Sequence, residues 1–322
     1  MKKLYFIIIS VLLLSSCSSV EVLTLDQLYP AEVCFPEQVS VVGVVNNMTP
    51  RSQLNKNILK SGILEGDGKS ATEALASAVA DSKYFNQIII CDSALQEKDI
   101  HDYLSVSDVD YLTSMLDVDI LFSFEKLSVN VQKKDYEVPE WGVSIPVISA
   151  EVSPEVAVYL PEREKPLMVI TPKDTIIFDV ESRLSEKSLM DEVIKEISSV
   201  ISNKLVPYWK PVNRLYFDGG SVEMRDAGVY IKEGDWVGAR DEWMNLYNRL
   251  KKGNAKFKSA FNIALSYEMA GDMNKAEEWL KKSSEYVSDN SIEEQALNYY
   301  KKELAERISV FSKLNIQMSR FE

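Results

Sequence analysis

Two different patterns of apolar and polar positions begin the folded part of the chain. Residues 38–45 are almost all apolar and mostly β-branched, which is typical of a strand buried on both faces. Residues 70–81 instead carry apolar side chains three and four positions apart, which predicts a helix with one buried stripe. Ser70 and Glu73 have the spacing of a capping box, so we expect this helix to begin at Ser70.

Alternating strand-like and helix-like patterns continue as far as residue 205. We expect further strands at 85–91, 120–131, 152–160, 167–170 and 175–180, and helices at 108–116 and 189–205. The last three strands are joined by connections too short for crossovers, which favours antiparallel pairing there. The sequence therefore predicts an α+β protein whose N-terminal domain, residues 37–212, is an α/β sandwich with a mixed sheet.

The C-terminal third of the chain has a helical pattern that repeats. The repeat pairs Gly234, Asp235 and Ala239 with Gly271, Asp272 and Ala276, at an offset of 37 residues. This pattern resembles the tetratricopeptide repeat (TPR), in which small residues at fixed places let antiparallel helices approach closely. The resemblance implies that residues 213–322 form an all-α domain of TPR-like helical repeats, closed by a long helix at 292–311.

A TPR-like array implies a concave face that holds an extended or helical peptide. By that resemblance the groove would include Met224, Gly228, Ile231, Phe261, Leu265 and Glu268. The alternative for each of these side chains is that it packs between helices. Both interpretations are compatible with the sequence.

The N-terminal residues have the features of an exported lipoprotein. A basic start, an apolar run at 4–14 and the small residues before Cys17 resemble a signal peptide that ends in a bacterial lipobox. The run is shorter than the roughly 20 residues that span a bilayer. The resemblance implies a signal peptide at 1–16, fatty acyl chains such as palmitate on Cys17, and a lipidated tether at 17–36. No acidic tract follows Cys17, which favours an outer-membrane anchor that faces the periplasm.

The mature chain also resembles an uncharacterised lipoprotein family of the Bacteroidetes. The matching residues lie at 205–209, 214–217, 234–236 and 260–264. The family implies an envelope lipoprotein with C-terminal repeats and implies no activity. The strand–helix order of the N-terminal domain also resembles the core of the curli secretion lipoprotein, which implies an oligomeric assembly component.

Charge and composition narrow the classes of partner. With 36 Lys and Arg against 49 Asp and Glu, the net charge is −13, which disfavours contact with nucleic acid and anionic lipid headgroups. Cys34 and Cys91 either form a disulfide, as an oxidising compartment permits, or remain as two thiols. His101 is the single histidine, and no Cys/His cluster has metal-ligand spacing, so we expect no metal and no cofactor.

The sequence carries no complete catalytic or nucleotide-binding motif. Gly68-Lys69-Ser70 resembles the end of a phosphate-binding loop, but Ile63 stands where the first glycine of that loop is needed. We therefore expect no nucleotide and no enzyme activity. The favoured function is a non-catalytic scaffold that binds an unidentified protein. The alternatives are an oligomeric envelope assembly or secretion component and a hydrolase whose site has no recognisable motif.

Overall fold

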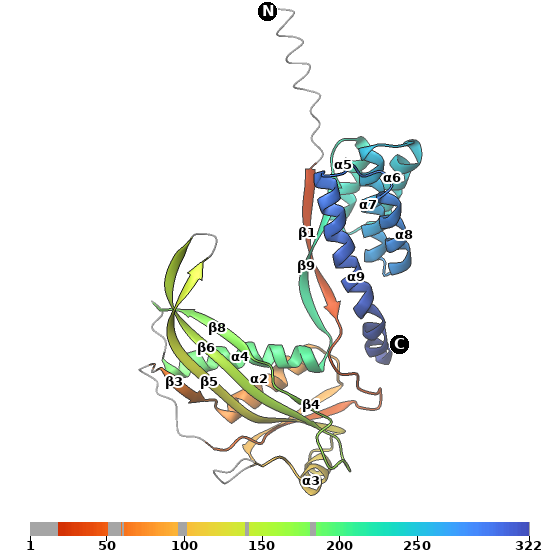
Figure 1. The fold of residues 1–322 in the computed structure, drawn as a ribbon. Helices are drawn as coiled ribbons and strands as arrows, with labels where there is room; N and C mark the ends of the chain where they lie inside the picture. The colour runs from red at the N-terminus through yellow and green to blue at the C-terminus, as the bar shows by residue number, and fades with distance from the viewer. Residues whose placement is uncertain are drawn as a thin grey trace, which may run out of the picture. The chain divides into compact units, whose positions relative to one another are not determined.

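The chain divides into two compact units (Figure 1). The computed structural model describes residues 19–50, 59, 61–95, 102–138, 142–180 and 185–321. The sheet unit comprises Pro30–Tyr208 and the described residues from Leu314 onward. The helical unit comprises the described residues up to Tyr29 together with Trp209–Lys313.

Within the described residues, the sheet unit is built on a seven-stranded mixed sheet. Its strands are β2 (Val41–Asn46), β3 (Gly62–Glu65), β4 (Gln87–Ala94), β5 (Ile120–Val138), β6 (Val143–Tyr159), β7 (Met168–Ile170) and β8 (Asp174–Asp179). Strand β2 lies between β4 and β5 and pairs parallel with both. The remaining pairs, β3–β5, β5–β6, β6–β7 and β6–β8, are antiparallel. The predicted α+β class and mixed sheet are confirmed.

Helices cover both faces of this sheet. They are α2 (Gly68–Asp81), α3 (Val106–Leu116) and α4 (Glu186–Leu205). On one face Leu75 of α2 and Ile197 of α4 pack in the same core as Val44. On the other face Leu112 of α3 packs with Val45. Strand β2 is therefore buried on both sides, as its apolar run predicts.

The start of α2 differs from the prediction. The N-cap is Asp67, whose carboxylate accepts a hydrogen bond from the Ser70 backbone N–H at 3.0 Å. The apolar stripe begins only at Ala71 because the first helical turn faces a polar hollow. The capping-box spacing of Ser70 and Glu73 placed the start at Ser70, whereas the helix begins two residues earlier, at Gly68.

The helical unit contains two helix pairs, and the turn between the two helices is equivalent in both pairs. Its helices are α5 (Val222–Lys232), α6 (Trp236–Arg249), α7 (Asn254–Met269), α8 (Met273–Ser283) and α9 (Ile292–Met318), which a short 3₁₀ turn (Ser319–Phe321) follows. Gly234 and Gly271 adopt φ of 77° and 78°, and the next residue in each turn is the N-cap of the following helix. The repeat predicted at Gly234 and Gly271 therefore has a common backbone geometry.

A strand replaces most of the predicted tether at 17–36. Strand β1 (Ser19–Tyr29) pairs with β9 (Tyr208–Asp218) in a two-stranded sheet. Burial alternates along β1. Leu23 and Gln27 face the interior of the helical unit, whereas Val22 is exposed. The tether prediction is wrong because the strand has no clean alternation of apolar and polar residues in the sequence: Val20 and Val22 are exposed, whereas Gln27 is buried.

The predicted domain boundaries shift accordingly. Strand β9 belongs to the helical unit from Trp209, and the last residues of α9 belong to the sheet unit. There the Gln317 amide exchanges hydrogen bonds with the Ala31 backbone, at 2.9 Å as acceptor and 3.1 Å as donor. Each unit is thus assembled from separate parts of the chain, which a boundary at 212 does not capture.

Candidate functional site

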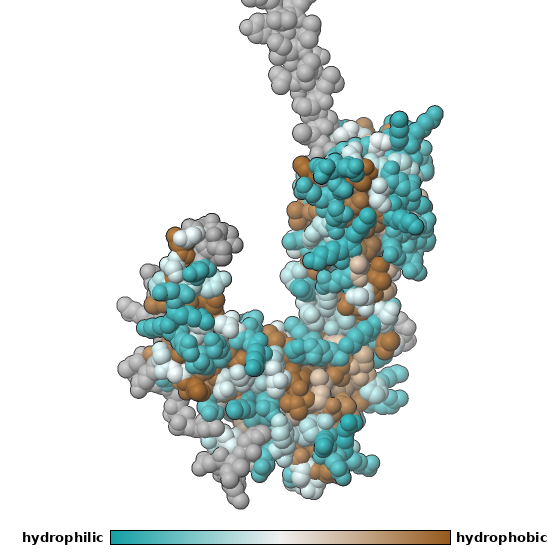
Figure 2. Space-filling view, viewed as in Figure 1, coloured by the Kyte–Doolittle hydropathy of each residue, from teal (hydrophilic) through white to brown (hydrophobic). Residues whose placement is uncertain are grey.

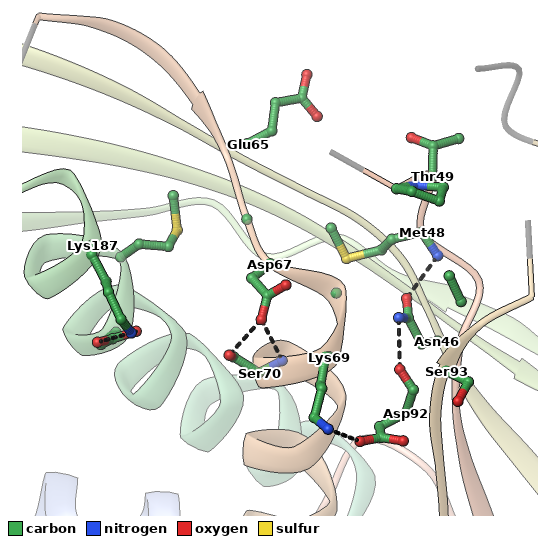
Figure 3. A pocket seen from close by; sticks show the side chains of 16 residues that line it. Asn46, Met48, Thr49, Glu65, Asp67, Lys69, Ser70, Asp92, Ser93 and Lys187 are labelled. Atoms are coloured by element: carbon green, nitrogen blue, oxygen red, sulfur yellow. Dashed lines mark hydrogen bonds and ion pairs between the residues drawn. The ribbon is translucent and has the colours of Figure 1, made fainter. Parts of the chain in front are cut away.

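The sheet unit has a hollow of about 520 Å³ at the carboxyl ends of β2 and β4 (Figure 3). Strand β2, the start of α2, the end of β4 and the first turns of α4 supply its lining. The charged and polar side chains in it are Asn46, Thr49, Glu65, Asp67, Lys69, Ser70, Asp92, Ser93, Lys187 and Asp191.

The topology of the sheet explains why a hollow forms here. Helix α2 connects β2 to β4 across one face, and α3 connects β4 to β5 across the other. The chain that leaves the carboxyl end of β2 therefore returns over one face, and the chain that leaves the carboxyl end of its parallel neighbour β4 returns over the other. Open α/β sheets bind ligands at such a switch point, so this edge is a candidate site by geometry.

The polar groups of the hollow are largely paired with one another. The Asn46 amide accepts from the Met48 N–H at 3.1 Å and donates to the Asp92 carbonyl at 3.0 Å. The Lys69 ammonium lies 2.9 Å from the Asp92 carboxylate. The hydrogen bond from Lys69 lowers the pKa of Asp92, and the same bond raises the pKa of Lys69. Lys187 is paired with Asp191 at 3.0 Å.

The charge of the hollow is unfavourable for a phosphate. Its lining carries four carboxylates, those of Glu65, Asp67, Asp92 and Asp191, and only two ammonium groups. The Asp67 carboxylate also occupies the N-terminal end of α2, because it accepts from the backbone N–H and hydroxyl of Ser70. An anion already fills the position that a phosphate uses at a helix start.

Packing accounts for the glycines that resemble a phosphate-binding loop. A Cβ on Gly68 would lie 2.4 Å from the Asn46 amide oxygen, and one on Gly66 would lie 2.4 Å from a Leu127 methyl. Both glycines are therefore required for the close approach of this turn to the sheet. The sequence Gly68-Lys69-Ser70 needs no nucleotide to explain it.

A buried carboxylate lies on the opposite face of the sheet, and the sequence analysis missed it. Glu125 is 1% exposed and stands at a bulge in β5. It accepts from the Asn47 amide at 2.6 Å and from the Tyr159 hydroxyl at 3.1 Å. Burial, followed by the charge of Glu125, raises the pKa of Tyr159. The usable signal was an acidic residue directly after the mostly apolar run at 120–124 that begins this strand.

The helical unit has a groove of about 560 Å³ between α8 and α9. Its floor includes the buried side chains of Leu280 and Leu304 and the half-buried Ile308. Its rim carries charges of both signs, from the exposed side chains of Glu277, Glu278, Lys281 and Lys301. An apolar floor with a charged rim suits a helical or extended peptide segment.

The six residues predicted to line a peptide groove are buried instead. Met224, Gly228, Ile231, Phe261, Leu265 and Glu268 all lie in the interior of the helical unit. Phe261 shows why, because its ring contacts Phe217 of β9 and Tyr300 of α9, both at 5.1 Å between centroids. A strand and a further helix cover the face that a TPR array leaves open, so the groove prediction is wrong.

Glu268, one of those six, belongs to a buried ion pair. The Arg214 guanidinium donates to its carboxylate at 2.8 Å and 3.1 Å, and the Tyr300 hydroxyl donates at 2.9 Å. Arg214 also donates to the Gln27 side chain at 3.0 Å and to Glu303 at 3.3 Å. Burial, followed by the charge of Glu268, raises the pKa of Tyr300. This cluster joins β1, β9, α7 and α9.

The two cysteines that the structure describes are free thiols. Cys34 is exposed and Cys91 is half-buried, so the possible disulfide is not formed. Cys17 and His101 lie outside the described residues. In the part of the chain that is described, no His, Cys, Asp and Glu side chains cluster as metal ligands, and no helix is long and apolar enough to cross a membrane.

These features define a two-unit α+β protein with a polar hollow in the sheet unit and a groove on the helical unit. The model of a family described as a domain of unknown function (DUF8603) matches residues 39–217, which is more than half of the chain. The protein belongs to this family. A second domain of unknown function (DUF6340) matches residues 225–306, which span most of α5, all of α6, α7 and α8, and the first part of α9.

A protein of known structure is similar to part of this chain. A hypothetical protein, CT253 from Chlamydia trachomatis, is similar at 14% identity over 52% of this chain and 98% of its own. The TM-score of 0.28 is too low to support a structural argument. No curated protein matches the chain.

Proposed function

We propose that the protein is a lipid-anchored, non-catalytic scaffold of the bacterial envelope that binds a segment of another protein through its helical unit. The observation that carries the proposal is the groove between α8 and α9, with its buried leucines and its rim of mixed charge. The anchor is the lipid on Cys17, in an outer-membrane lipoprotein that faces the periplasm, as in the Bacteroidetes family that the sequence resembles.

The two helix pairs support a TPR-like character. The turns at Gly234 and Gly271 share their φ values, and in both the N-cap aspartate donates its N–H to a tyrosine carbonyl at 2.9 Å. Repeats of this kind commonly present peptide-binding surfaces. The groove proposed here lies between α8 and α9, because β9 and α9 cover the residues first expected to form it.

The pairing of charges in the sheet-unit hollow favours a non-catalytic function. Both lysines there are in ion pairs, and the hydroxyl of Ser70 donates to Asp67, the helix cap. A general base or an activated nucleophile needs an adjacent group that shifts its pKa toward the working pH. Here the Lys69–Asp92 bond moves both pKa values away from neutrality.

Crosslinking in cells tests the scaffold. Lys301 lines the groove, whereas Lys302, its neighbour in sequence, does not. We expect Lys301→Glu to reduce severalfold the capture of a specific partner, and the matched change Lys302→Glu to leave capture intact. Equal capture by both variants and the unchanged chain would contradict binding in this groove. The anchor is tested separately, because Cys17→Ala should release the protein from the membrane fraction, and protease added to intact cells should leave it uncleaved.

A second candidate function, an oligomeric assembly component, is favoured by the long β5–β6 hairpin. Strand β6 pairs with β8 only from Val147, so the outer part of the hairpin extends beyond the core. Tyr136, Val143 and Ile145 are exposed there. Mass measurement of the soluble mature chain separates the two candidates. A strict monomer at high concentration contradicts the oligomer.

A further inference from the structure

The position of β1 brings the proposed lipid site close to the helical unit. Strand β1 begins at Ser19, two residues after Cys17. Two residues of extended chain reach at most about 7 Å. Any lipid on Cys17 therefore holds the first residues of β1 close to the bilayer surface.

Strand β1 is firmly joined to the rest of the helical unit. Arg214 donates to the Gln27 side chain at 3.0 Å, and Arg307 of α9 donates to the Leu28 carbonyl at 2.6 Å. The Thr24 hydroxyl also donates to the Asn213 side chain at 2.8 Å. The first unit after the lipid site is thus an ordered part of the fold, and its orientation to the bilayer is restricted.

The starts of α5, α7 and α9 gather at the end of the unit where β1 begins (Figure 1). Burial, then the charge of Asp218 and then that of Glu21, raises the pKa of Tyr216. Because Glu21 lies near the beginning of β1 and Tyr216 near the end of β9, the end of β9 lies beside the beginning of β1. Next to that end, the Lys258 ammonium lies 5.2 Å from the centre of the Phe217 ring. Lys258 is also 3.2 Å from the carboxylate of Glu293 in the first turn of α9.

Exposed aliphatic side chains stand at this same end. Val22 is 62% exposed, Val222 is 58% exposed and Ile292 is 68% exposed. The exposed Lys251 and Lys252 follow α6 in the neighbouring loop. Figure 2 shows hydrophobic residues among the polar ones on this unit. We call this surface, defined by Val22, Val222 and Ile292, the anchor-proximal end.

We propose that the anchor-proximal end lies against the lipid bilayer, with the helical unit standing on it. The proposal rests on the proposed lipid anchor and adds an orientation to it. Aliphatic side chains gain from leaving water at the acyl boundary, and the short reach from Cys17 brings them there. Carboxylates such as Glu21 and Glu223 accompany the lysines here, so the contact suits a zwitterionic surface.

The test uses the mature chain, residues 17–322, coupled by Cys17 to a maleimide phospholipid in phosphatidylcholine vesicles. Cys34→Ser and Cys91→Ser leave Cys17 as the single thiol. Hydroxyl-radical footprinting then compares side-chain oxidation before and after coupling. We expect oxidation of Val22, Val222 and Ile292 to fall severalfold.

Val237 supplies the matched control. It is 56% exposed and lies at the start of α6, at the opposite end of the α5–α6 pair from Val222. Its oxidation should not change on coupling. Unchanged oxidation at Val222 and Ile292, or an equal loss at Val237, overturns the proposal. Protection of Val222 and Ile292 from oxidation that grows with the number of protein molecules per vesicle also overturns the proposal. In that case a second copy of the protein, and not the bilayer, would cover this end.

A pair of variants gives an independent readout. Val222→Asp with Ile292→Asp should restore the oxidation of Val22 in the coupled protein, whereas Val237→Asp should leave Val22 protected. Because the coupling is chemical, this result does not depend on lipidation in cells. The lipid anchor itself is tested in cells by Cys17→Ala. If that chain stays in the membrane fraction, the proposed anchor is wrong, whatever the vesicle experiment shows.

Discussion

The two units differ in how their interiors are held together. On the α2–α4 face of the sheet unit the core is an apolar cluster that includes Val44, Leu75 and Ile197. The core of the helical unit contains a guanidinium and a carboxylate, those of Arg214 and Glu268, each 1% exposed. An apolar core accepts many arrangements of similar volume, whereas a buried ion pair requires a particular one. The interior of the helical unit therefore depends on one specific charged pairing, which the apolar cluster described on the α2–α4 face of the sheet unit lacks.

The largest expected effect comes from breaking the buried ion pair. Arg214→Met leaves the Glu268 carboxylate buried without its charged partner, which should cost about 3–5 kcal/mol in the free energy of unfolding. Urea unfolding measures the loss. Hydrogen exchange of peptides from 209–313 and 30–208 shows which unit opens.

The double variant Arg214→Met with Glu268→Leu is the control for that measurement. Because it removes both charges, it should recover most of the lost stability. A double variant no more stable than Arg214→Met would show that the cost lies in lost packing, and the contrast between the two cores would then fail.

The sheet unit should respond to lost volume. Leu75 is fully buried in α2, so Leu75→Ala should leave a cavity and cost about 2–5 kcal/mol. Ser77→Ala, on the exposed face of the same helix, should cost almost nothing. Hydrogen exchange should show the Leu75→Ala effect in peptides from 30–208 first. Equal destabilisation by both changes would show that α2 is loosely packed.

The difference between an apolar core and a buried ion pair also explains which parts of the fold the sequence could predict. Strand β2 and helix α2 have local apolar patterns that reflect their burial, and the turns at Gly234 and Gly271 have a local signature. The ion pair joins residues 54 positions apart, and Gln27 is 187 positions from Arg214. No local pattern carries such a pairing.

The candidate site was harder to predict than the fold. The TPR resemblance placed Phe261 and Glu268 in an open groove, because a repeat motif specifies the faces of a helix pair and not what covers them. Here β9 and α9 cover that face. The groove of Leu280 and Leu304 depends on α9, which lies outside the repeat. The sheet-unit hollow follows from topology, which short motifs do not reveal.

Alkaline pH should weaken both units through buried tyrosines. Burial raises the pKa of Tyr300 in the helical unit and of Tyr159 in the sheet unit. Unfolded tyrosine titrates near pH 10. The protonated phenols therefore stabilise the fold fully below about pH 10, and this contribution is lost as the pH rises toward their folded pKa values.

Tyrosine-to-phenylalanine variants assign this pH dependence. Tyr300→Phe should flatten the alkaline loss of stability in peptides from 209–313, and Tyr159→Phe should do so in peptides from 30–208. Each variant serves as the control for the other. If either change flattened the dependence in both units equally, the two units would not open separately.

The smallest expected effect tests whether the two helix pairs are equivalent. Gly234 and Gly271 have left-handed φ of 77° and 78°, so an alanine at either position should cost about 1 kcal/mol through backbone strain. Space is not the cause, because a Cβ on Gly234 would have no atom within 4 Å and one on Gly271 would touch only the Phe311 ring at 4.0 Å. Asparagine tolerates this conformation better, so Gly271→Asn should cost less than Gly271→Ala. Urea unfolding of the three single variants, Gly234→Ala, Gly271→Ala and Gly271→Asn, measures these differences. A Gly271→Ala cost far above that of Gly234→Ala would show that the second turn has a packing function that the first lacks.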